Sequence, residues 1–208
     1  MFSLQTIFGK GTQFFGLLED AAVTAVDSTR ALHAMLREHH QPLQLDVFRL
    51  ARERERAVSD KINEELLCSF VTALEREDIE ALRAALVRIP KQVERFAERY
   101  VLATGILDQV DFAPRAAMLE QAAEVVLEMV RRLRRMKAEE MRLLNDRLRS
   151  IESEADRLML ELYREIYAGR FGGQQMFLIK EFFEILEKAI DRCREAGTVA
   201  YQIVLKNN

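Results

Sequence analysis

The chain has few residues that interrupt helices, since its 208 residues include only eight glycines and three prolines. It has two cysteines and no tryptophan. Two cysteines exclude a disulfide framework and a four-thiolate zinc site, so Cys68 and Cys193 are expected to be free thiols. The sequence has neither a long apolar run nor a basic amino-terminal segment followed by an apolar core. These absences predict a soluble, cytoplasmic protein.

No charge of either sign dominates the chain. It has 31 basic and 34 acidic residues, a formal net charge of −3 and a pI of about 5.8. Nucleic-acid-binding proteins usually carry a basic face and a high pI, so we expect no nucleic-acid partner. The sequence also has no Gly-x-Ser-x-Gly motif and no glycine-rich phosphate loop, so we expect no enzyme activity.

The residues that are abundant, namely Leu, Ala, Glu and Arg, favour helices, and apolar positions recur at helical spacing. The sequence therefore predicts an all-α fold. Pro42 ends the first helix, Thr72 and Glu75 have the spacing of a capping box, and Gly105 is a candidate left-handed residue after the third helix. Pro90 is expected to bend that helix. The expected helices are 11–40, 43–71, 72–105, a fourth from 115, a fifth that ends at 169, and 175–205.

An internal repeat divides the second half of the chain. Residues 115–168 contain no breaker, yet one helix of that length is improbable in a compact domain. Asp60-Lys-Ile matches Asp156-Arg-Leu at an offset of 96 residues, which places a turn near 137–141. The third and sixth helices align at an offset of 100. The chain is therefore predicted to form two tandem three-helix bundles of long antiparallel helices, 1–108 and 109–208, within one compact domain.

Two pairs of acidic residues stand out in the second half. Glu152 with Asp156, and Glu187 with Asp191, are spaced four apart, so each pair lies on one helix face. If their helices are antiparallel neighbours, the four carboxylates converge, and protons, cationic side chains or a metal must offset their repulsion. Oxygen donors favour Mg, Ca, Mn or Fe, and zinc is also compatible. The alternative is that such pairs arise by chance in an acid-rich helical chain and only solvate an exposed face.

Other potential ligands and charges give weaker signals. No Glu-x-x-His motif occurs, which argues against a ferritin-like di-iron bundle. His33, His39 and His40 lack companion ligands, and we expect them to lie at the surface or to interact with the helix dipole. The basic cluster formed by 131–135 and Lys137 could face a phosphorylated partner or an anionic membrane, but a solvated face partly neutralised by nearby acids is the simpler interpretation.

Five segments of the chain, taken in order, resemble the PhoU-like phosphate-transport regulators, specifically the branch of small proteins that accompany Pit-type phosphate transporters. The resemblance covers nearly the whole chain, and the order of the segments and the tandem halves make it more specific than any one motif. The segments are Phe14–Glu19, Arg76–Ile79, Ile151–Leu158, Leu186–Ala196 and Tyr201–Lys206.

The resemblance implies two three-helix bundles side by side, with acidic pairs that hold iron or another metal such as Mn, Mg or Zn. In this chain the implied metal site is Glu152, Asp156, Glu187 and Asp191. It also implies a cytoplasmic, non-catalytic regulator of inorganic phosphate transport that contacts a transporter or an associated signalling protein. Such a protein would meet the membrane only through its partner, and self-association stays open. The alternative is a metal-free helical scaffold that joins protein partners.

The first half departs from this pattern. The repeat alignment places Arg56, Val87 and Lys91 opposite three of the four acidic residues, so only Asp60 is retained. Arginine, valine and lysine do not coordinate a hard cation, so we expect no metal cluster in this half. We also expect Arg56 or Lys91 to pair with Asp60 and supply the positive charge that a metal supplies in the other half.

Overall fold

The structure is a computed structural model that describes residues 11–38, 45–107 and 110–207. The described residues form six α-helices and one short 3-10 helix and contain no strand, which confirms the predicted all-α fold. The elements are α2 (Gln13–Arg37), α3 (Asp46–Cys68), α4 (Arg76–Leu107), α5 (Ala113–Arg132), η1 (Leu133–Arg135), α6 (Ala138–Tyr167) and α7 (Gly173–Lys206).

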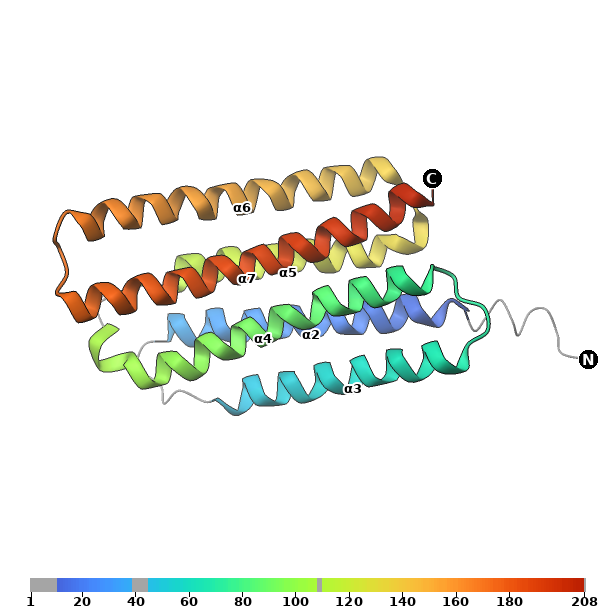
Figure 1. Ribbon diagram of the computed structural model, residues 1–208, viewed down its shortest axis with the longest axis horizontal. Coiled ribbons are helices and arrows are strands. Elements are labelled where there is room, and N and C mark those ends of the chain that lie inside the picture. The colour runs from blue at the N-terminus through green and yellow to red at the C-terminus, as the bar shows by residue number, and fades with distance from the viewer. Residues whose placement is uncertain (1–10, 39–44, 108–109, 208) are drawn as a thin grey trace, which may run out of the picture.

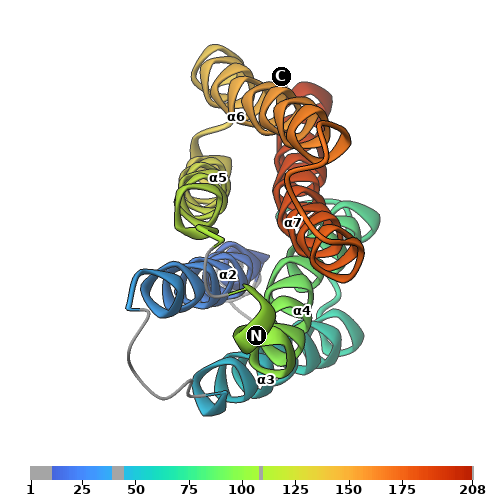
Figure 2. The same cartoon turned by 90° about the vertical axis from the view of Figure 1, so that its left-hand side faces the viewer.

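Four of the helices form the inner part of the bundle, and two lie outside it (Figure 1). The inner helices are α2, α4, α5 and α7, with α4 packed on α7 and α2 packed on α5. The end view in Figure 2 shows α6 and α3 at opposite ends of the stack. Helix α6 packs on α7 and α5, and α3 packs on α2 and α4. The long helices therefore bury their apolar faces in one shared core.

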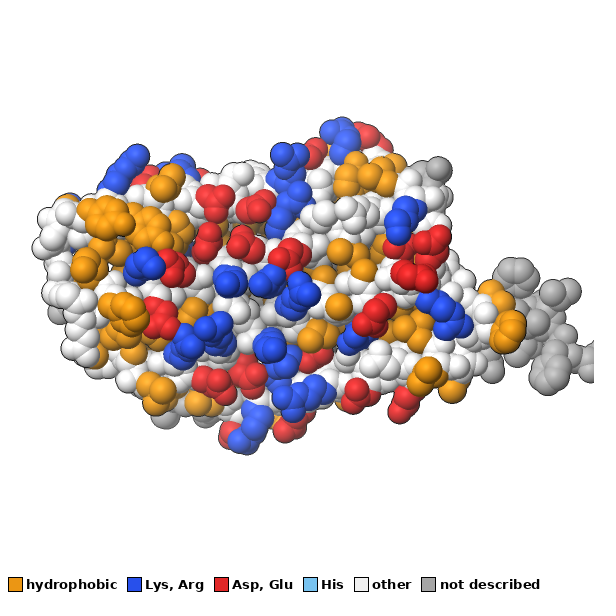
Figure 3. All heavy atoms as spheres, viewed as in Figure 1, with side chains coloured by type: hydrophobic (Ala, Val, Ile, Leu, Met, Phe, Trp, Pro, Cys, Tyr) orange, Lys and Arg blue, Asp and Glu red, His pale blue; other side chains and the backbone are white. Residues whose placement is uncertain are grey.

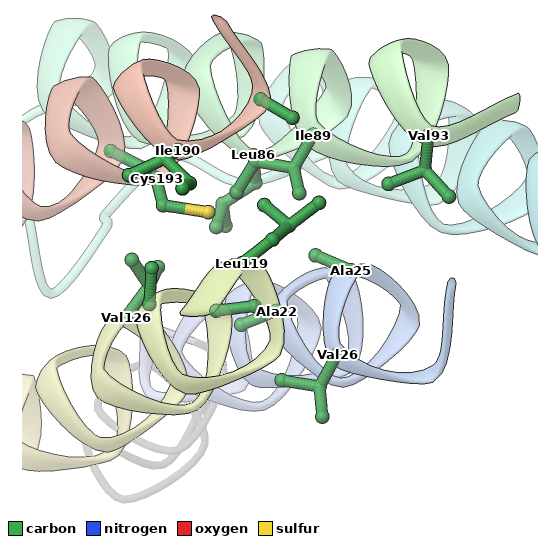
Figure 4. Packing of buried hydrophobic residues seen from close by; sticks show 14 of the residues in the cluster. Ala22, Ala25, Val26, Leu86, Ile89, Val93, Leu119, Val126, Ile190 and Cys193 are labelled. Carbon is green, nitrogen blue, oxygen red and sulfur yellow. The ribbon is translucent and has the colours of Figure 1, made fainter. Parts of the chain in front are cut away.

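All four inner helices contribute side chains to that core (Figure 4). Ala22 of α2, Leu86 of α4, Leu119 of α5 and Cys193 of α7 are almost completely buried. Burial in this apolar environment raises the pKa of the Cys193 thiol, so it packs as a small apolar group and is not reactive. Cys68 is exposed, and both cysteines are free as expected.

Aromatic rings join α4 to the two carboxyl-terminal inner helices. Phe96 of α4 lies edge-on to Phe182 of α7, with ring centroids 5.1 Å apart, and Phe112 lies 4.6 Å from Phe183. The Arg115 guanidinium lies 4.1 Å above the Phe183 ring and donates a hydrogen bond of 2.9 Å to the carbonyl of Leu158. This cation–π contact and hydrogen bond tie α5 to both α7 and α6.

The start and end of the third predicted helix were wrong in detail. Helix α4 begins at Arg76, and the amides of Asp78 and Ile79 bond to the carbonyl of Glu75, so Thr72 does not cap it. The Arg76 guanidinium donates to carbonyls near the end of α3, which keeps 69–75 in a connection between the helices. Gly105 lies inside α4 and has no left-handed backbone, whereas Gly169 does, with φ 77°. Helix α4 continues through Pro90.

The turn inferred from the repeat exists but lies a few residues before 137–141. Helix α5 ends at Arg132, η1 follows, and Met136 adopts a left-handed conformation with φ 48° before α6 begins at Ala138. A non-glycine residue rarely adopts this conformation, so nothing in the local sequence marked the turn. The boundary at 108/109 includes residues outside the described ranges, and the division into 1–108 and 109–208 stays a prediction.

Helix α7 approaches its neighbours most closely at Gly197. A Cβ atom at this position would lie 2.3 Å from Cδ2 of Leu148 and 3.2 Å from Sδ of Met129. Both neighbours are fully buried, so they have little room to move. Gly105, by contrast, is a helical glycine with open space around its Cα.

These two glycines make a matched pair of substitutions. Gly105→Ala should raise the free energy of unfolding by about 0.5–1 kcal/mol, because alanine favours the helix. Gly197→Ala should be less stable than Gly105→Ala by about 1–3 kcal/mol, because overpacking opposes the same gain. Urea unfolding of both variants and the parent measures the difference. Equal stabilisation by the two substitutions would show that the close approach at Gly197 is not rigid.

Candidate metal site

The helices that carry the two acidic pairs are antiparallel neighbours, as predicted (Figure 1). Glu152 and Asp156 lie in α6, and Glu187 and Asp191 lie in α7. Figure 3 shows acidic side chains gathered over these two helices in the upper middle of the face. Three of the four residues are partly buried, but Asp156 is exposed, so its side chain does not border apolar surface as the sequence suggested.

The four carboxylates lie close enough to repel one another. Burial raises the pKa of the Glu187 carboxyl above its ordinary value, and repulsion from Asp191 and Asp156 raises it further. Burial also raises the pKa of Asp191, and its repulsion comes from Glu152 and Asp156. The two pairs therefore form one negative site between α6 and α7, and ionisation of its α7 residues is opposed.

One cationic side chain already compensates part of this charge. Nε of Arg194 lies 3.2 Å from Oε2 of Glu152. The same guanidinium donates to the Asn145 side chain at 2.9 Å and to the Thr198 hydroxyl at 2.8 Å, which fixes its position. The spacing of the acidic residues did not predict a role for Arg194, although it lies three residues after Asp191 and so on a neighbouring part of the same helix face.

A further acidic residue of α7 that the sequence pattern did not single out is Glu184, which lies one turn before Glu187. The Tyr163 hydroxyl of α6 donates a hydrogen bond of 2.7 Å to Glu184, and Lys180 forms an ion pair with it at 2.6 Å. These two partners lower the pKa of the Glu184 carboxyl, and the hydrogen bond raises the pKa of Tyr163 to about 12. Glu184 is therefore satisfied by protein partners, unlike Glu187 and Asp191.

The donor chemistry of the site suits a hard cation, but the geometry is not that of a closed metal cage. All four predicted ligands supply carboxylate oxygens, as Mg, Mn and Fe prefer. In the described ranges, however, no group of three or more His, Cys, Asp or Glu side chains is placed to hold an ion together. The site fits a cation in its negative charge and in its ligand type. Its carboxylates are not close enough together to hold one ion, and the Glu152 carboxylate is paired with Arg194.

The first half contains a different charge arrangement from the one expected. Asp60 is exposed, and the pairs recorded within 4.0 Å among the described residues do not join it to Arg56 or Lys91. Instead, Arg52 pairs with Glu55 and, at 3.1 Å, with Glu94. Burial raises the pKa of Glu55 although Arg52 favours its carboxylate form. The buried pairs of this half are thus built from residues that the repeat alignment did not single out.

The remaining candidates form side-chain hydrogen bonds and ordinary ion pairs. Nδ1 of His33 lies 2.7 Å from Oε2 of Glu120 on α5, whereas His39 and His40 lie outside the described residues. In the basic cluster, Arg131 pairs with Glu19 at 2.7 Å and Lys137 pairs with Glu140 at 3.2 Å. These contacts agree with the interpretation of that cluster as a partly neutralised, solvated face. None of the helices in the described ranges combines the length and apolar character needed to cross a membrane.

The fold is that of PhoU-like proteins. A crystal structure of a PhoU-like protein from Shewanella oneidensis MR-1 matches with a TM-score of 0.78 and 13% identity, over 93% of this chain and 99% of that one. A second protein from the same organism, provisionally named a PhoU-like phosphate regulatory protein, matches with a TM-score of 0.77 and 14% identity, over the same shares. No family model and no curated protein sequence matches the chain.

The raised pKa values of Glu187 and Asp191 predict how stability depends on pH. Their ordinary values are 4.5 and 3.8, and a raised folded-state pKa means that ionisation opposes folding. The cost is absent below the ordinary values and complete once the pH exceeds the folded-state values. Glu187→Gln with Asp191→Asn should therefore stabilise the protein at pH 7 by about 0.2–1 kcal/mol, the range of partly exposed charge interactions.

Glu184→Gln provides a control of opposite sign on the same helix. The lowered pKa of Glu184 contributes stability above its ordinary value of 4.5, and this contribution is lost as the pH falls through the folded-state value. The substitution should destabilise the protein at pH 7. Urea unfolding at pH 7 and near pH 4 measures both effects, and the two differences should shrink together as the pH falls. If both variants shift stability in the same direction at pH 7, the assigned electrostatics are wrong.

Proposed function

We propose that this protein is a cytoplasmic, non-catalytic regulator of inorganic phosphate transport. The observation that carries the proposal is the likeness of fold over almost the whole of both chains to a protein named for phosphate regulation. The segments of the sequence that resemble Pit-associated PhoU-like proteins extend over the same length of chain. Because a fold alone does not define a function, the charged site between α6 and α7 must supply the chemistry.

The site is proposed to take up a divalent or trivalent cation such as Fe, Mn, Mg or Zn. Asp156, Glu187 and Asp191 supply carboxylates without a recorded protein counter-charge within 4.0 Å in the described part of the chain. Glu152 becomes a fourth donor when it leaves Arg194. A bound cation would remove the repulsion that raises the pKa values of Glu187 and Asp191. Binding would be driven by the attraction between the cation and the carboxylates, which replaces the repulsion among the carboxylates.

The regulator is proposed to act by contact with a phosphate transporter of the Pit type or an associated signalling protein. Large apolar side chains are exposed near the α6–α7 connection, where Tyr167 is 82% exposed, Phe177 65% and Leu160 61%. Figure 3 shows apolar side chains gathered at this end of the face. Contiguous exposed apolar surface is typical of protein contact sites, and it lies beside the proposed cation site on the same two helices.

A metal-free helical scaffold is the second candidate function. The observation that favours it is the spacing of the acidic side chains, since the described residues include no group of three placed to hold one ion. In this function Arg194 is the permanent counter-ion of the site, and the exposed apolar side chains still contact partners. The two candidates differ in whether cation binding depends on the α7 acids.

Metal analysis of the purified protein separates the candidates. After equilibration with Mn²⁺ or Fe²⁺ and dialysis, the parent protein should retain metal, and Glu187→Gln with Asp191→Asn should lose most of it, because two oxygen donors become poorer ligands. Arg194→Met should retain at least as much metal as the parent, because Glu152 is released. The control is Glu154→Gln with Glu161→Gln, which removes two exposed α6 charges that pair with Arg157. Equal metal in all four proteins, or none in the parent, contradicts the cation site.

Phosphate uptake tests the regulatory role itself. Cells that lack the gene should take up labelled phosphate at an altered rate, and the parent gene and the Glu154→Gln, Glu161→Gln control should restore it. The Glu187→Gln, Asp191→Asn variant should not restore it if the cation is required. An unchanged uptake rate after deletion of the gene would contradict the regulatory proposal. Full restoration by the Glu187→Gln, Asp191→Asn variant would favour the metal-free scaffold.

A further inference from the structure

A basic groove lies along α4 where it faces α7, next to the acidic site in the view of Figure 3. It is a cavity of about 460 Å³ whose basic lining residues are Arg88, Lys91 and Arg95 of α4 and Arg192 of α7. Figure 3 shows Lys and Arg side chains gathered across the middle of the face, over α7 and α4. The volume is within the range of roughly 300–1,000 Å³ that is usual for small-molecule sites.

Helix geometry brings these cations together. Residues 88, 91 and 95 are spaced by three and four positions, so they follow one face of α4. Gln92, a buried lining residue on α4, joins this helix to α7, because its side chain donates a hydrogen bond of 3.4 Å to the carbonyl of Ile185. The groove therefore lies on a seam between two long, well-packed helices, and its basic side chains start from fixed backbone positions.

Two of the arginines are held in place and keep donors available. Glu195 accepts hydrogen bonds from both Arg88, at 3.2 Å, and Arg192, so it holds the two guanidinium groups side by side. Each guanidinium has five N–H donors, and one from each is used in these bonds. Several donors on each arginine thus remain for a ligand, and arginine donors match phosphate oxygens in pairs.

The other charges of the groove leave positive charge in excess. Lys91 and Arg95 are exposed, and the ion pairs recorded within 4.0 Å among the described residues include neither of them. Of the two acidic lining residues, Glu94 accepts from Nε of Arg52 at 3.1 Å, and it shares that guanidinium with Glu55 of α3. Glu94, Glu98 and the Glu195 carboxylate that holds Arg88 and Arg192 offset three of the four positive charges of the lining, so one positive charge remains in excess. The groove is therefore suited to a multivalent anion.

The predicted repeat alignment pairs a residue of this groove with a residue of the acidic site. Lys91 is the residue that aligns with Asp191 at the offset of 100, so the position that carries an acid in the second half carries a cation here. At these aligned positions α4 therefore has Val87 and the cation Lys91 where α7 has Glu187 and Asp191.

We propose that the basic groove binds an oxyanion with several phosphoryl groups, such as pyrophosphate or tripolyphosphate. The cations from residue 88 to residue 95 extend along about 10 Å of helix, which a single phosphate does not cover and a short phosphate chain does. A macromolecular partner would need an interface of about 800 Å² on each side, whereas this site is one small concavity. No groove residue belongs to the proposed cation site, so the proposal stands independently of the proposed function.

Isothermal titration calorimetry with tripolyphosphate at an ionic strength of about 0.15 M, where charges more than about 8 Å apart are largely screened, tests the groove. The parent should bind, and Lys91→Glu with Arg95→Glu should weaken binding by about tenfold or more, because charge-assisted hydrogen bonds are lost. The matched control is Arg147→Glu with Arg149→Glu, which makes the same formal charge change on exposed α6 residues that do not line the groove. This control should change the affinity by about twofold or less.

Several outcomes would overturn the proposal. They are absence of binding to the parent, equal weakening by the groove and control variants, and no weakening by the groove variant. Lys91→Gln with Arg95→Gln, checked for helix content by circular dichroism, keeps the test valid if charge reversal unfolds the protein, and it should also weaken binding. A glutamate-rich peptide of matched charge should bind at least about tenfold more weakly than tripolyphosphate. Equal binding of the peptide through Lys91 and Arg95 would overturn the phosphate class of the ligand.

Discussion

The packing of α7 against its neighbours is the constraint on which both charged surfaces depend. Ile190 and Cys193 of α7 are buried in the core among the inner helices, and this burial fixes the rotation of α7 about its axis. Once that rotation is fixed, Asp191 is directed to the acids of α6, while Arg192 lines the groove beside α4. Two adjacent residues therefore serve sites of opposite charge because helix geometry separates them by about 100°.

The helical architecture was predictable because its causes are local. Few glycines and prolines interrupt the apolar periodicity, so long helices follow from composition and spacing. The ends of the helices were less predictable, because they depend on contacts between distant residues. Arg76 binds the carbonyls at the end of α3, and Met136 adopts a left-handed conformation without a glycine. Neither feature has a signature in the neighbouring sequence.

The sequence predicted which helix face carries each acidic pair, but not the contacts that these residues make between helices. Spacing of four residues places Glu187 and Asp191 together on α7, but the pairing of α6 with α7 sets their distances to Glu152 and Asp156. Arg194 meets Glu152, and Tyr163 meets Glu184, only through that pairing. Glu184 is therefore neutralised by protein partners while Glu187 and Asp191 are not, and a single sequence does not show this difference.

The opposite charges of the acidic site and the basic groove are compatible with one fold because neither charged surface is part of the core. The core residues aligned by the repeat, such as Leu86 with Leu186, are buried in both halves. Substitutions at exposed positions such as Lys91 usually change stability by less than about 0.5 kcal/mol, whereas loss of a buried leucine costs roughly 2–5 kcal/mol. The packing therefore restricts the apolar positions strongly and the charged positions weakly. A helical bundle can therefore carry surface sites of opposite sign while its core packing keeps the helices in place, as α4 and α7 do here.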